Sequence, residues 1–304
     1  MSLSSSSAPT PIFLVGATAA GKSELGLALA RRTGGAILAM DAMQVYRGAD
    51  IGTGKPTPAE RAEIPHGGLD LVEFGSNFDV AQYLKYATEF LREQRAAGRR
   101  VIVTGGTGLY FRALTRGLCE APQGPDELRV ELAALSAEQL RERLKRVDPA
   151  MLERLDASNP RRLSRAIEVM ESTGRSLRAW QEETPEPPVR EFRAFWIERD
   201  KNVLRDRIAR RVGAMFAAGW VGEVRGLVAR YGAEAVRAFP GIGYREIAEA
   251  LAKGAAPESA QGDIVVTTRQ YAKRQLTWFN RELNLQKIML SGPEMPPLEV
   301  PFLS

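Results

Sequence analysis

A phosphate-binding motif close to the N-terminus constrains this chain more than any other feature. The motif G-x-x-x-x-G-K-[ST] is matched by Gly16-Ala17-Thr18-Ala19-Ala20-Gly21-Lys22-Ser23. An apolar run, Ile12–Val15, precedes the motif, and a segment of helical character, Ser23–Arg32, follows it. Such a loop points its N–H groups inward at the start of a helix, where Lys22 adds a charge and the Ser23 hydroxyl can bind Mg²⁺. The sequence therefore predicts a P-loop that grips phosphates.

The motif leaves open what happens to the bound phosphates. A phosphoryl group could be transferred, a nucleotide could be hydrolysed, or a pyrophosphate could be held as a leaving group. Cys119 is the single cysteine and His66 the single histidine. This excludes a disulfide within the chain, a Cys/His zinc site, and any Ser-His-Asp triad built without His66. Acid–base chemistry is therefore expected from carboxylates.

The order of the predicted elements indicates the fold class. Apolar runs at Ala36–Asp41 and Val101–Thr104 are typical of two further buried strands, and Asp79–Ala97 has helical spacing. Strand, helix, strand, helix, strand is the order of a parallel sheet flanked by helices on both faces. We expect an α/β, P-loop NTPase-like core.

The pattern changes after Leu118, where helical segments replace the alternation. A polar, proline-rich stretch, Glu182–Pro188, precedes a strand-like run at Phe192–Ile197, and helices fill most of 201–281. We therefore expect an all-helical insertion within the core. The expected limits are 1–10 for a disordered tail, 11–118 and 192–287 for the core, 119–191 for the insertion, and 288–304 for an irregular C-terminal tail.

The positive charge is unevenly distributed. The net charge is +5, yet residues 141–178 hold ten Lys/Arg against six Asp/Glu and residues 199–281 hold fifteen against eight, which leaves −6 elsewhere. Such clustering fits either a polyanion-binding face or solvated arginine-rich helices. No apolar run approaches the roughly 20 residues of a membrane span. The start of the chain lacks the charged and apolar regions of a signal peptide, so we expect a cytoplasmic protein without a membrane partner.

Asp41 is the carboxylate that stands out, because it ends a predicted strand. The carboxyl ends of strands in an open α/β sheet line the ligand crevice. A carboxylate there can be a magnesium ligand, a loop cap or a general base. The position by itself leaves these three roles open.

Several motifs, in one order along the chain, resemble the tRNA dimethylallyltransferases. They are Asp41–Gly48, Asp50–Pro56, Gly105–Tyr110, Arg161–Ala166, Gly243–Glu246 and Thr268–Trp278. Together with the P-loop they run from Gly16 to Trp278. Three positions depart from the family pattern: Ala17 replaces a proline, Ala42 replaces a serine, and Ser158-Asn159-Pro160 replaces Asn-Asp-Pro. The missing Ser hydroxyl at position 42 removes one expected contact to the target base.

The resemblance implies transfer of the dimethylallyl group of dimethylallyl diphosphate to the exocyclic amine of an adenosine in tRNA. That adenosine lies immediately 3′ of the anticodon in tRNAs that read codons beginning with U, and pyrophosphate leaves. An aromatic amine is a poor nucleophile, so a carboxylate that accepts its proton assists the attack, and Asp41 is the candidate. Lys22, Mg²⁺ on Ser23, and Arg211 are the candidates that stabilise the pyrophosphate. Thr107, in a glycine turn, is expected beside the target nucleotide.

The resemblance also implies a tRNA-binding set, with the helical insertion clasping the anticodon stem-loop around an extruded base. Its members are Asp41, Ala42, Met43, Gln44, Thr107, Arg129, Arg161, Arg162, Leu163, Ser164 and Arg165. The expected partners are the tRNA anticodon stem-loop and dimethylallyl diphosphate, with no obligate protein partner and a monomeric enzyme. Three alternatives stay open: a small-molecule or nucleotide kinase, an isopentenyltransferase of free adenine nucleotides, and a nucleotide-gated RNA-binding module.

Overall fold

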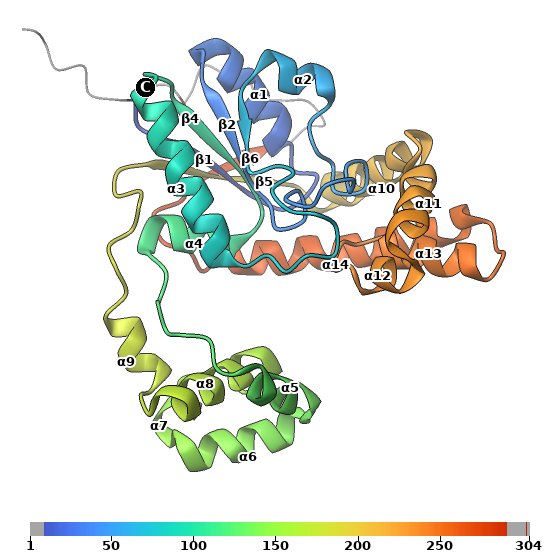
Figure 1. Cartoon of the computed structure of the whole chain (residues 1–304). Helices are drawn as coiled ribbons and strands as arrows, with labels where there is room; N and C mark the ends of the chain where they lie inside the picture. Colours follow the sequence, from blue (N-terminus) through green and yellow to red (C-terminus); the bar gives the residue numbers. More distant parts are fainter. Residues whose placement is uncertain (1–8, 291–301, 303–304) are drawn as a thin grey trace, which may run out of the picture. The chain divides into compact units, whose positions relative to one another are not determined.

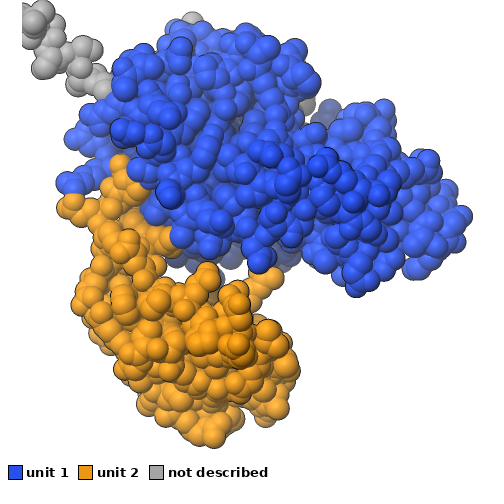
Figure 2. All heavy atoms as spheres, in the orientation of Figure 1, with its two compact units in different colours: residues 1–113, 189–304 blue, residues 114–188 orange. Residues whose placement is uncertain are grey.

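The structure, a computed structural model, describes residues 9–290 and Phe302. The chain forms two compact units, coloured separately in Figure 2. Unit 1 contains residues 1–113 and 189–304, and unit 2 contains residues 114–188. The expected insertion, 119–191, begins five residues later and ends three residues later than unit 2. Most of the two expected tails, residues 1–8, 291–301 and 303–304, lies outside the described residues.

Unit 1 is built on a parallel sheet of six strands in the order β3-β2-β4-β1-β5-β6 (Figure 1). The strands are β1 (Ile12–Gly16), β2 (Ala36–Met40), β3 (His66–Gly67), β4 (Val101–Gly105), β5 (Arg193–Arg199) and β6 (Gln286–Leu290). The predicted α/β class, a parallel sheet flanked by helices, is confirmed. Because β1 lies between β4 and β5, its carboxyl end and the P-loop sit in the middle of one sheet edge.

The residues of β1 alternate between the two faces of the sheet. Ile12 and Leu14 join the core beneath α1 (Lys22–Thr33). The ring of Phe13, on the opposite face, packs 5.5 Å from that of Phe111. Phe111 lies on α4 (Gly108–Arg116), which covers this face with α3 (Val80–Ala96) and α14 (Gln261–Phe279) (Figure 1). Every side chain of β1 is buried, as expected for a strand covered on both faces.

The prediction of an irregular tail from residue 288 onward is wrong for Ile288–Leu290, because these residues belong to β6. The strand pairs in parallel with β5, Ile288 opposite Ile197 and Leu290 opposite Arg199. Only Leu290 of its five residues is buried. An edge strand this exposed lacks the apolar pattern that sequence reasoning relies on.

Four helices of unit 1 form a second core beside the sheet. They are α10 (Lys201–Ala217), α11 (Trp220–Tyr231), α12 (Ala233–Ala238) and α13 (Tyr244–Ala252), followed by the 3₁₀ turn η1 (Pro257–Ala260). Val45, Tyr46 and Ala49, from the loop after β2, pack into this core against Trp220 and Phe239. The helices therefore fix the loop that carries the Asp41 motif. No single described helix is long and apolar enough to span a membrane, whereas α10 and α11, bent by 60°, pass that test as a pair.

Unit 2 contains helices only. They are α5 (Asp126–Ala134), α6 (Ala137–Val147), α7 (Pro149–Leu152), α8 (Pro160–Thr173) and α9 (Leu177–Glu182). The short helix α2 (Pro58–Glu63) belongs to unit 1. The core of unit 2 contains Leu132, Leu140, Leu144 and Leu163, which follow helical spacing on α5, α6 and α8. Asn159 is the N-cap of α8, and its side chain accepts a hydrogen bond from the Arg162 N–H. Ser158-Asn159-Pro160 therefore still caps the helix, although it departs from the family's Asn-Asp-Pro.

Candidate active site

A cavity of about 420 Å³ opens at the carboxyl ends of the central strands. Its lining includes much of the predicted site, namely Thr18, Ala19, Gly21, Lys22, Ser23, Asp41, Gln44 and Arg211. Thr107 is not part of the lining, but its Oγ1 accepts a hydrogen bond of 3.2 Å from the N–H of Ala42, the residue after Asp41. The prediction that the P-loop, Asp41 and Thr107 converge at one sheet edge is confirmed.

The P-loop is held by its own lysine. Lys22 begins α1, and its Nζ donates to the Ala17 carbonyl at 2.6 Å. Ala19 adopts a φ of 61°, a conformation that a residue with a β-carbon rarely takes. Strain of this kind persists only where neighbouring contacts fix the backbone. In this loop two arginines make those contacts.

Arg207 and Arg199, which lie far from the P-loop in sequence, also bind it. Arg207 Nε, on α10, donates to the Ala19 carbonyl at 2.8 Å, and Arg199 Nε, at the end of β5, donates to the Ala20 carbonyl at 2.8 Å. Arg207 also pairs with Glu24 on α1. Together with Lys22, these arginines donate hydrogen bonds to three carbonyls of the loop, those of Ala17, Ala19 and Ala20. These hydrogen bonds fix the backbone shape of the loop from within the protein.

Burial controls the protonation of Lys22. Desolvation, reinforced by the positive charge of Arg211 and opposed by Asp41, lowers the pKa of Lys22 to about 7. Burial likewise lowers the pKa of Arg211 from its usual value, against the attraction of Asp41. An arriving polyanion would favour both charged forms, because an opposite charge nearby offsets desolvation. The pocket is thus electrostatically suited to phosphate.

Asp41 opens on this pocket yet is enclosed by protein. Burial raises the pKa of its carboxyl, whereas a hydrogen bond of 2.8 Å from the Met43 N–H to Oδ1 and the charges of Lys22 and Arg211 oppose the rise. In the described part of the chain no direct ion pair joins Asp41 to either cation, so the three charges interact at longer range. A carboxylate with a raised pKa is a stronger base than an exposed one. Asp41 can therefore accept a proton in this pocket.

A turn at Asp50–Lys55 forms the wall beside Arg211. Gln44 Nε2 donates to the carbonyls of Thr53 and Gly54 at 3.1 Å each, which ties the Asp41 motif to this wall. The Arg211 guanidinium packs against Gly54, where a β-carbon would come 2.1 Å from Nη2. A glycine is required there, because any side chain would displace Arg211. The Nε2 group of Gln44, a residue of the expected tRNA-binding set, is thus engaged within the protein.

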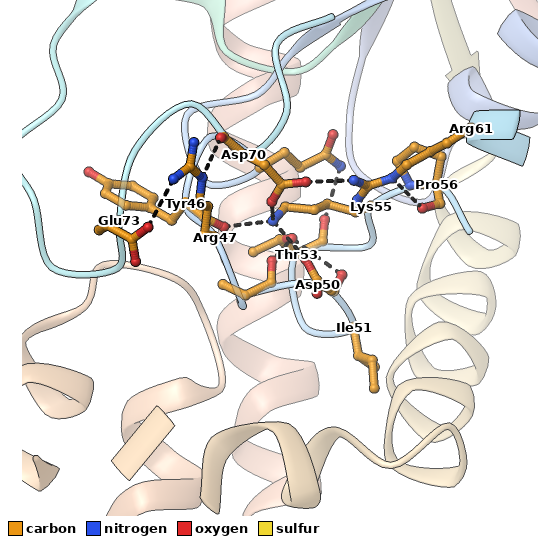
Figure 3. A network of polar contacts seen from close by, with 12 residues as sticks. Tyr46, Arg47, Asp50, Ile51, Thr53, Lys55, Pro56, Arg61, Asp70 and Glu73 are labelled. Atoms are coloured by element: carbon orange, nitrogen blue, oxygen red, sulfur yellow. Dashed lines mark hydrogen bonds and ion pairs between the residues drawn. The ribbon is translucent and has the colours of Figure 1, made fainter. Parts of the chain in front are cut away.

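Two anchors hold this turn from opposite sides. The Glu223 carboxylate of α11 accepts hydrogen bonds from the backbone N–H groups of Asp50, Ile51 and Gly52 and from the Tyr244 hydroxyl. Lys55, whose side chain is 1% exposed, donates to the Tyr46 carbonyl and to the carboxylates of Asp50 and Asp70 (Figure 3). The motif Asp50–Pro56 is thus a structural support for Gln44 and Arg211.

The donors around Ser23 fit a hard cation. Ser23, Asp41 and Glu24 line the pocket with oxygen atoms. The described residues contain no group of three or more His, Cys, Asp or Glu side chains that could enclose a metal by themselves. Mg²⁺ commonly uses one or two protein oxygens, substrate phosphates and water. A site on Ser23 completed by phosphate oxygens is consistent with that chemistry.

The predicted tRNA-binding residues of unit 2 do not form one uniform surface. Arg161 and Arg162 are exposed on α8, and Arg129 is exposed and pairs with Asp126. Arg165 donates to the Ala121 carbonyl at 2.6 Å and pairs with the buried Glu168 at 2.9 Å. The Leu163 side chain is fully buried in the core of unit 2, so it cannot contact RNA directly.

A second hollow, of about 370 Å³, lies within unit 2 between α5, α6 and α8. Its lining includes four of the predicted residues, Arg129, Arg161, Ser164 and Arg165. The acidic member is Glu168, which also accepts a hydrogen bond from the Gly124 N–H at 2.7 Å. Four of the predicted residues of unit 2 therefore share one concave face, although their exposure and contacts differ, whereas Arg162 and the buried Leu163 lie outside it.

Sequence reasoning missed several pocket residues. Arg210, Tyr271 and Gln275 line the cavity, and Arg207, which shares a helix face with Arg211, was not assigned to the P-loop. Tyr271 and Gln275 belong to the quoted motif Thr268–Trp278, so a signal was present. Their four-residue spacing on a helix, together with Ala272 buried in a small core with Ala17 and Ala19, is the pattern of a helix packed against the loop.

The fold and the pocket define a P-loop enzyme whose phosphate site lies beside a partly buried carboxylate. A family model described as IPP transferase matches residues 44–282. The chain is 42% identical over 283 residues to a tRNA dimethylallyltransferase of Methylacidiphilum infernorum, covering 93% of this chain and 86% of that protein. It is 43% identical over 277 residues to one of Geobacter metallireducens, covering 89% of each. The chain belongs to the IPP transferase family, and the predicted family resemblance is confirmed.

Solved structures agree with this assignment. The full-length tRNA isopentenylpyrophosphate transferase of Bacillus halodurans is similar with a TM-score of 0.65 and 30% identity, covering 93% of this chain and 90% of that one. A eukaryotic dimethylallyltransferase described as acting on tRNA matches with a TM-score of 0.80 at 23% identity, over 93% of this chain and 74% of that one. The second likeness supports the fold. Together with the sequence relatives, the first identifies the chain as an enzyme of the prenyltransferase class.

Proposed function

We propose that this enzyme transfers the dimethylallyl group of dimethylallyl diphosphate to the exocyclic amine of the adenosine 3′-adjacent to the anticodon, in tRNAs that read codons beginning with U. Pyrophosphate is the second product. The observation that carries the proposal is the single cavity in which the P-loop, Asp41 and Arg211 meet in a chain of this family. The cations suit the leaving group, and the carboxylate suits the nucleophile.

Asp41 is the general base of this reaction. The amine nitrogen forms a bond to the first carbon of the dimethylallyl group while the bond from that carbon to the diphosphate oxygen breaks. The Asp41 carboxylate takes the proton that the amine loses. Burial raises the pKa of Asp41, which strengthens it as a base, and the hydrogen bond from the Met43 N–H orients the carboxylate.

The leaving pyrophosphate gains negative charge as the carbon–oxygen bond breaks. Lys22, Arg211 and the P-loop N–H groups stabilise that charge, because burial desolvates the two cations and strengthens their attraction to an anion. Ser23 would hold Mg²⁺ together with the diphosphate oxygens, and a bound Mg²⁺ supplies further neutralisation of the leaving group. The arginines that hold the loop carbonyls keep its shape during the reaction.

The target adenosine must leave its stacked position to react. Enzymes that modify bases extrude the target into a pocket, and proteins recognise RNA loops by such splayed bases. Asp41, Ala42, Met43, Gln44 and Thr107 are proposed to contact this nucleotide. Arg129, Arg161, Arg162, Ser164 and Arg165, on unit 2, are proposed to bind the anticodon stem-loop, with Arg165 acting mainly through the fold of its helix.

One incubation tests this function. The enzyme, Mg²⁺, unmodified tRNA and labelled dimethylallyl diphosphate are mixed, the RNA is digested, and the nucleosides are separated; parallel reactions contain adenosine monophosphate in place of tRNA, or ATP in place of dimethylallyl diphosphate. Prenylated adenosine at the position 3′ of the anticodon is the expected result, with loss of labelling when that adenosine is replaced by guanosine. Label on free adenosine monophosphate with equal efficiency would establish the adenylate isopentenyltransferase alternative. Transfer of phosphate from ATP, with no prenylation, would establish the kinase.

We further propose that the enzyme acts as a monomer in the cytoplasm without an obligate protein partner. All residues proposed for the reaction come from one chain. Light scattering at the concentrations used for turnover tests this point. A dimer whose dissociation abolishes activity would contradict it.

A further inference from the structure

Gln275 is a buried glutamine with both ends of its side-chain amide engaged. It lies on α14, and the residue is 6% exposed. Its Oε1 accepts a hydrogen bond of 2.8 Å from the Thr18 N–H in the P-loop, and its Nε2 donates to the Gly106 carbonyl at 3.0 Å. The partners are 257 and 169 residues away in sequence. A single side chain thus joins the loops that follow β1 and β4.

The link continues to the proposed base. Gly106 precedes Thr107, whose Oγ1 accepts the N–H of Ala42 at 3.2 Å, and Ala42 follows Asp41. Hydrogen bonds therefore run from the P-loop through Gln275 and the Gly106-Thr107 turn to the Asp41 segment. The first end of this path holds the leaving group, and the other end holds the carboxylate that takes the proton.

The link at Gly106 depends on a close approach between the Gln275 amide and the backbone. A β-carbon at residue 106 would lie 1.9 Å from Nε2 of Gln275, so a glycine is required for the amide to reach the turn. The hydrogen bond to Gln275 Oε1 gives the Thr18 N–H a partner within the protein, so the other N–H groups of the loop remain for phosphate. Gln275 therefore acts on the backbone of both loops at fixed distances.

We infer that Gln275 is a positioning residue that sets the separation between the phosphate site and the Asp41 carboxylate. The inference rests on the proposed function, because it needs a leaving group at one end and a base at the other. Transfer between two bound substrates requires the reacting atoms to lie in a near-attack arrangement, and a misplacement of about 1 Å can cost roughly 10²-fold in rate. Each half-site can still bind its own ligand when the separation is wrong.

The test is Gln275→Glu, which keeps nearly the same shape. The introduced carboxylate still accepts the Thr18 N–H but faces the Gly106 carbonyl with an oxygen in place of a donor. We expect kcat for prenyl transfer to fall by roughly 10- to 100-fold. KM for dimethylallyl diphosphate and for tRNA should change by less than about threefold, because an interaction that matters only at the transition state lowers kcat.

The matched control is Gln270→Glu, an exposed glutamine of the same helix. It introduces the same charge on α14 and should leave kcat and KM at native values. Thermal unfolding and calorimetric binding of inorganic pyrophosphate show whether the Gln275 variant keeps its fold and its phosphate site. A kcat within twofold of native overturns the inference, as does a loss that lies entirely in KM for dimethylallyl diphosphate.

A second variant tests the same path if Gln275→Glu unfolds. Thr107→Val keeps the shape of the side chain and removes the acceptor for the Ala42 N–H. It should also lower kcat with little change in KM for dimethylallyl diphosphate, and a near-native kcat would overturn the inference; KM for tRNA is no criterion for this variant, because Thr107 is also proposed to contact the target nucleotide. Where both variants fold, their combined loss should be close to the larger single loss, since both break one path; fully multiplicative losses would contradict that coupling. A native enzyme that prenylates no tRNA refutes the proposed function, whereas native activity with unaffected variants refutes only the role of Gln275.

Discussion

The cavity of unit 1 and the hollow of unit 2 both gather arginines, yet they hold them in different ways. In the cavity, Lys22 is buried and Arg211 is partly buried; burial lowers the pKa of both, and no direct ion pair joins either to Asp41 among the described contacts. In the hollow, Arg129 and Arg161 stay exposed, and Arg129 already pairs with Asp126. The cavity contains cations that burial has desolvated, whereas the cations of the hollow stay in contact with water.

These two environments give the charges different energetic effects on binding. A buried charge without a close partner is destabilising until a ligand of opposite charge arrives, so each such group contributes strongly and non-additively to a small anion's site. Exposed arginines exchange water and surface partners for phosphates, and each gives a modest, salt-sensitive contribution. Single substitutions should therefore be severe in the cavity and mild in the hollow.

The largest effect is expected at Asp41. Replacing Asp41 by Asn keeps the shape of the side chain and removes the proton acceptor, so turnover should fall by roughly 10²–10⁴-fold. The binding of tRNA should change little, because the exposed arginines of unit 2 remain. Single-turnover prenylation and filter binding measure the two quantities. Near-native turnover in both Asp41→Asn and Asp41→Ala would remove Asp41 as the base.

Arg211 should give the next largest loss. Arg211→Ala removes a partly buried cation that interacts with Asp41 and packs on Gly54, and kcat/KM for dimethylallyl diphosphate should fall by about 10²–10³-fold. Arg205→Ala, an exposed position on the same helix, is the matched control and should be near native. Steady-state kinetics with varied dimethylallyl diphosphate decide the question. If both variants behave alike, Arg211 is an ordinary surface residue.

Lys22 should make pyrophosphate binding depend on pH. Its pKa is about 7 in the free protein and rises when an anion binds, so above pH 7 binding takes up a proton at Lys22. Affinity should consequently fall as the pH rises above 7, by up to about tenfold per pH unit. Calorimetry at pH 8, in two buffers of different ionisation enthalpy, counts the protons.

Lys22→Met provides the comparison that isolates this proton, because pyrophosphate itself also titrates. At pH 8, the native protein should take up about one proton more than the variant when pyrophosphate binds. Equal proton uptake by both proteins would show that Lys22 is already charged in the free enzyme. In that case the cavity would resemble the hollow in its electrostatics.

The smallest single effects are expected in unit 2. Arg161→Gln and Arg162→Gln should each lower tRNA affinity by about two- to fivefold. Each lost phosphate contact should also flatten the slope of log K against log salt by roughly 0.7–0.9. Arg32→Gln, at an exposed position in unit 1, is the control for charge. Diphosphate binding should stay native throughout, and a parallel loss of it would contradict the division of labour.

Arg165 differs from Arg161 and Arg162, because its contacts are structural. Its bonds to the Ala121 carbonyl and to buried Glu168 tie the start of the insertion to α8. Reversing its charge together with Arg161 and Arg162 would therefore mix loss of fold with loss of RNA contacts. The test of RNA binding is cleaner with Arg129 in its place.

Much of the fold and of the site was accessible from sequence, for local reasons. The P-loop, the strands before it and around Asp41, and the helical insertion each follow from short segments whose pattern is their own. The expected tRNA set, by contrast, treated Arg161–Arg165 as one strip. Helical geometry places Leu163 in the core and Arg165 against Glu168, so only part of that strip faces water.

The α/β class, the phosphate loop and the family follow from the sequence, because they depend on residues close together in the chain or on motifs in a fixed order. The distant groups that complete the pocket could be identified only in the folded chain. Arg199, Arg207 and Gln275 reach the P-loop from positions 179, 188 and 257 residues away from their partners. Periodicity and propensity carry no information on such pairs. The exposed strand β6 was hidden for the same reason, since its pairing with β5 is what makes it a strand.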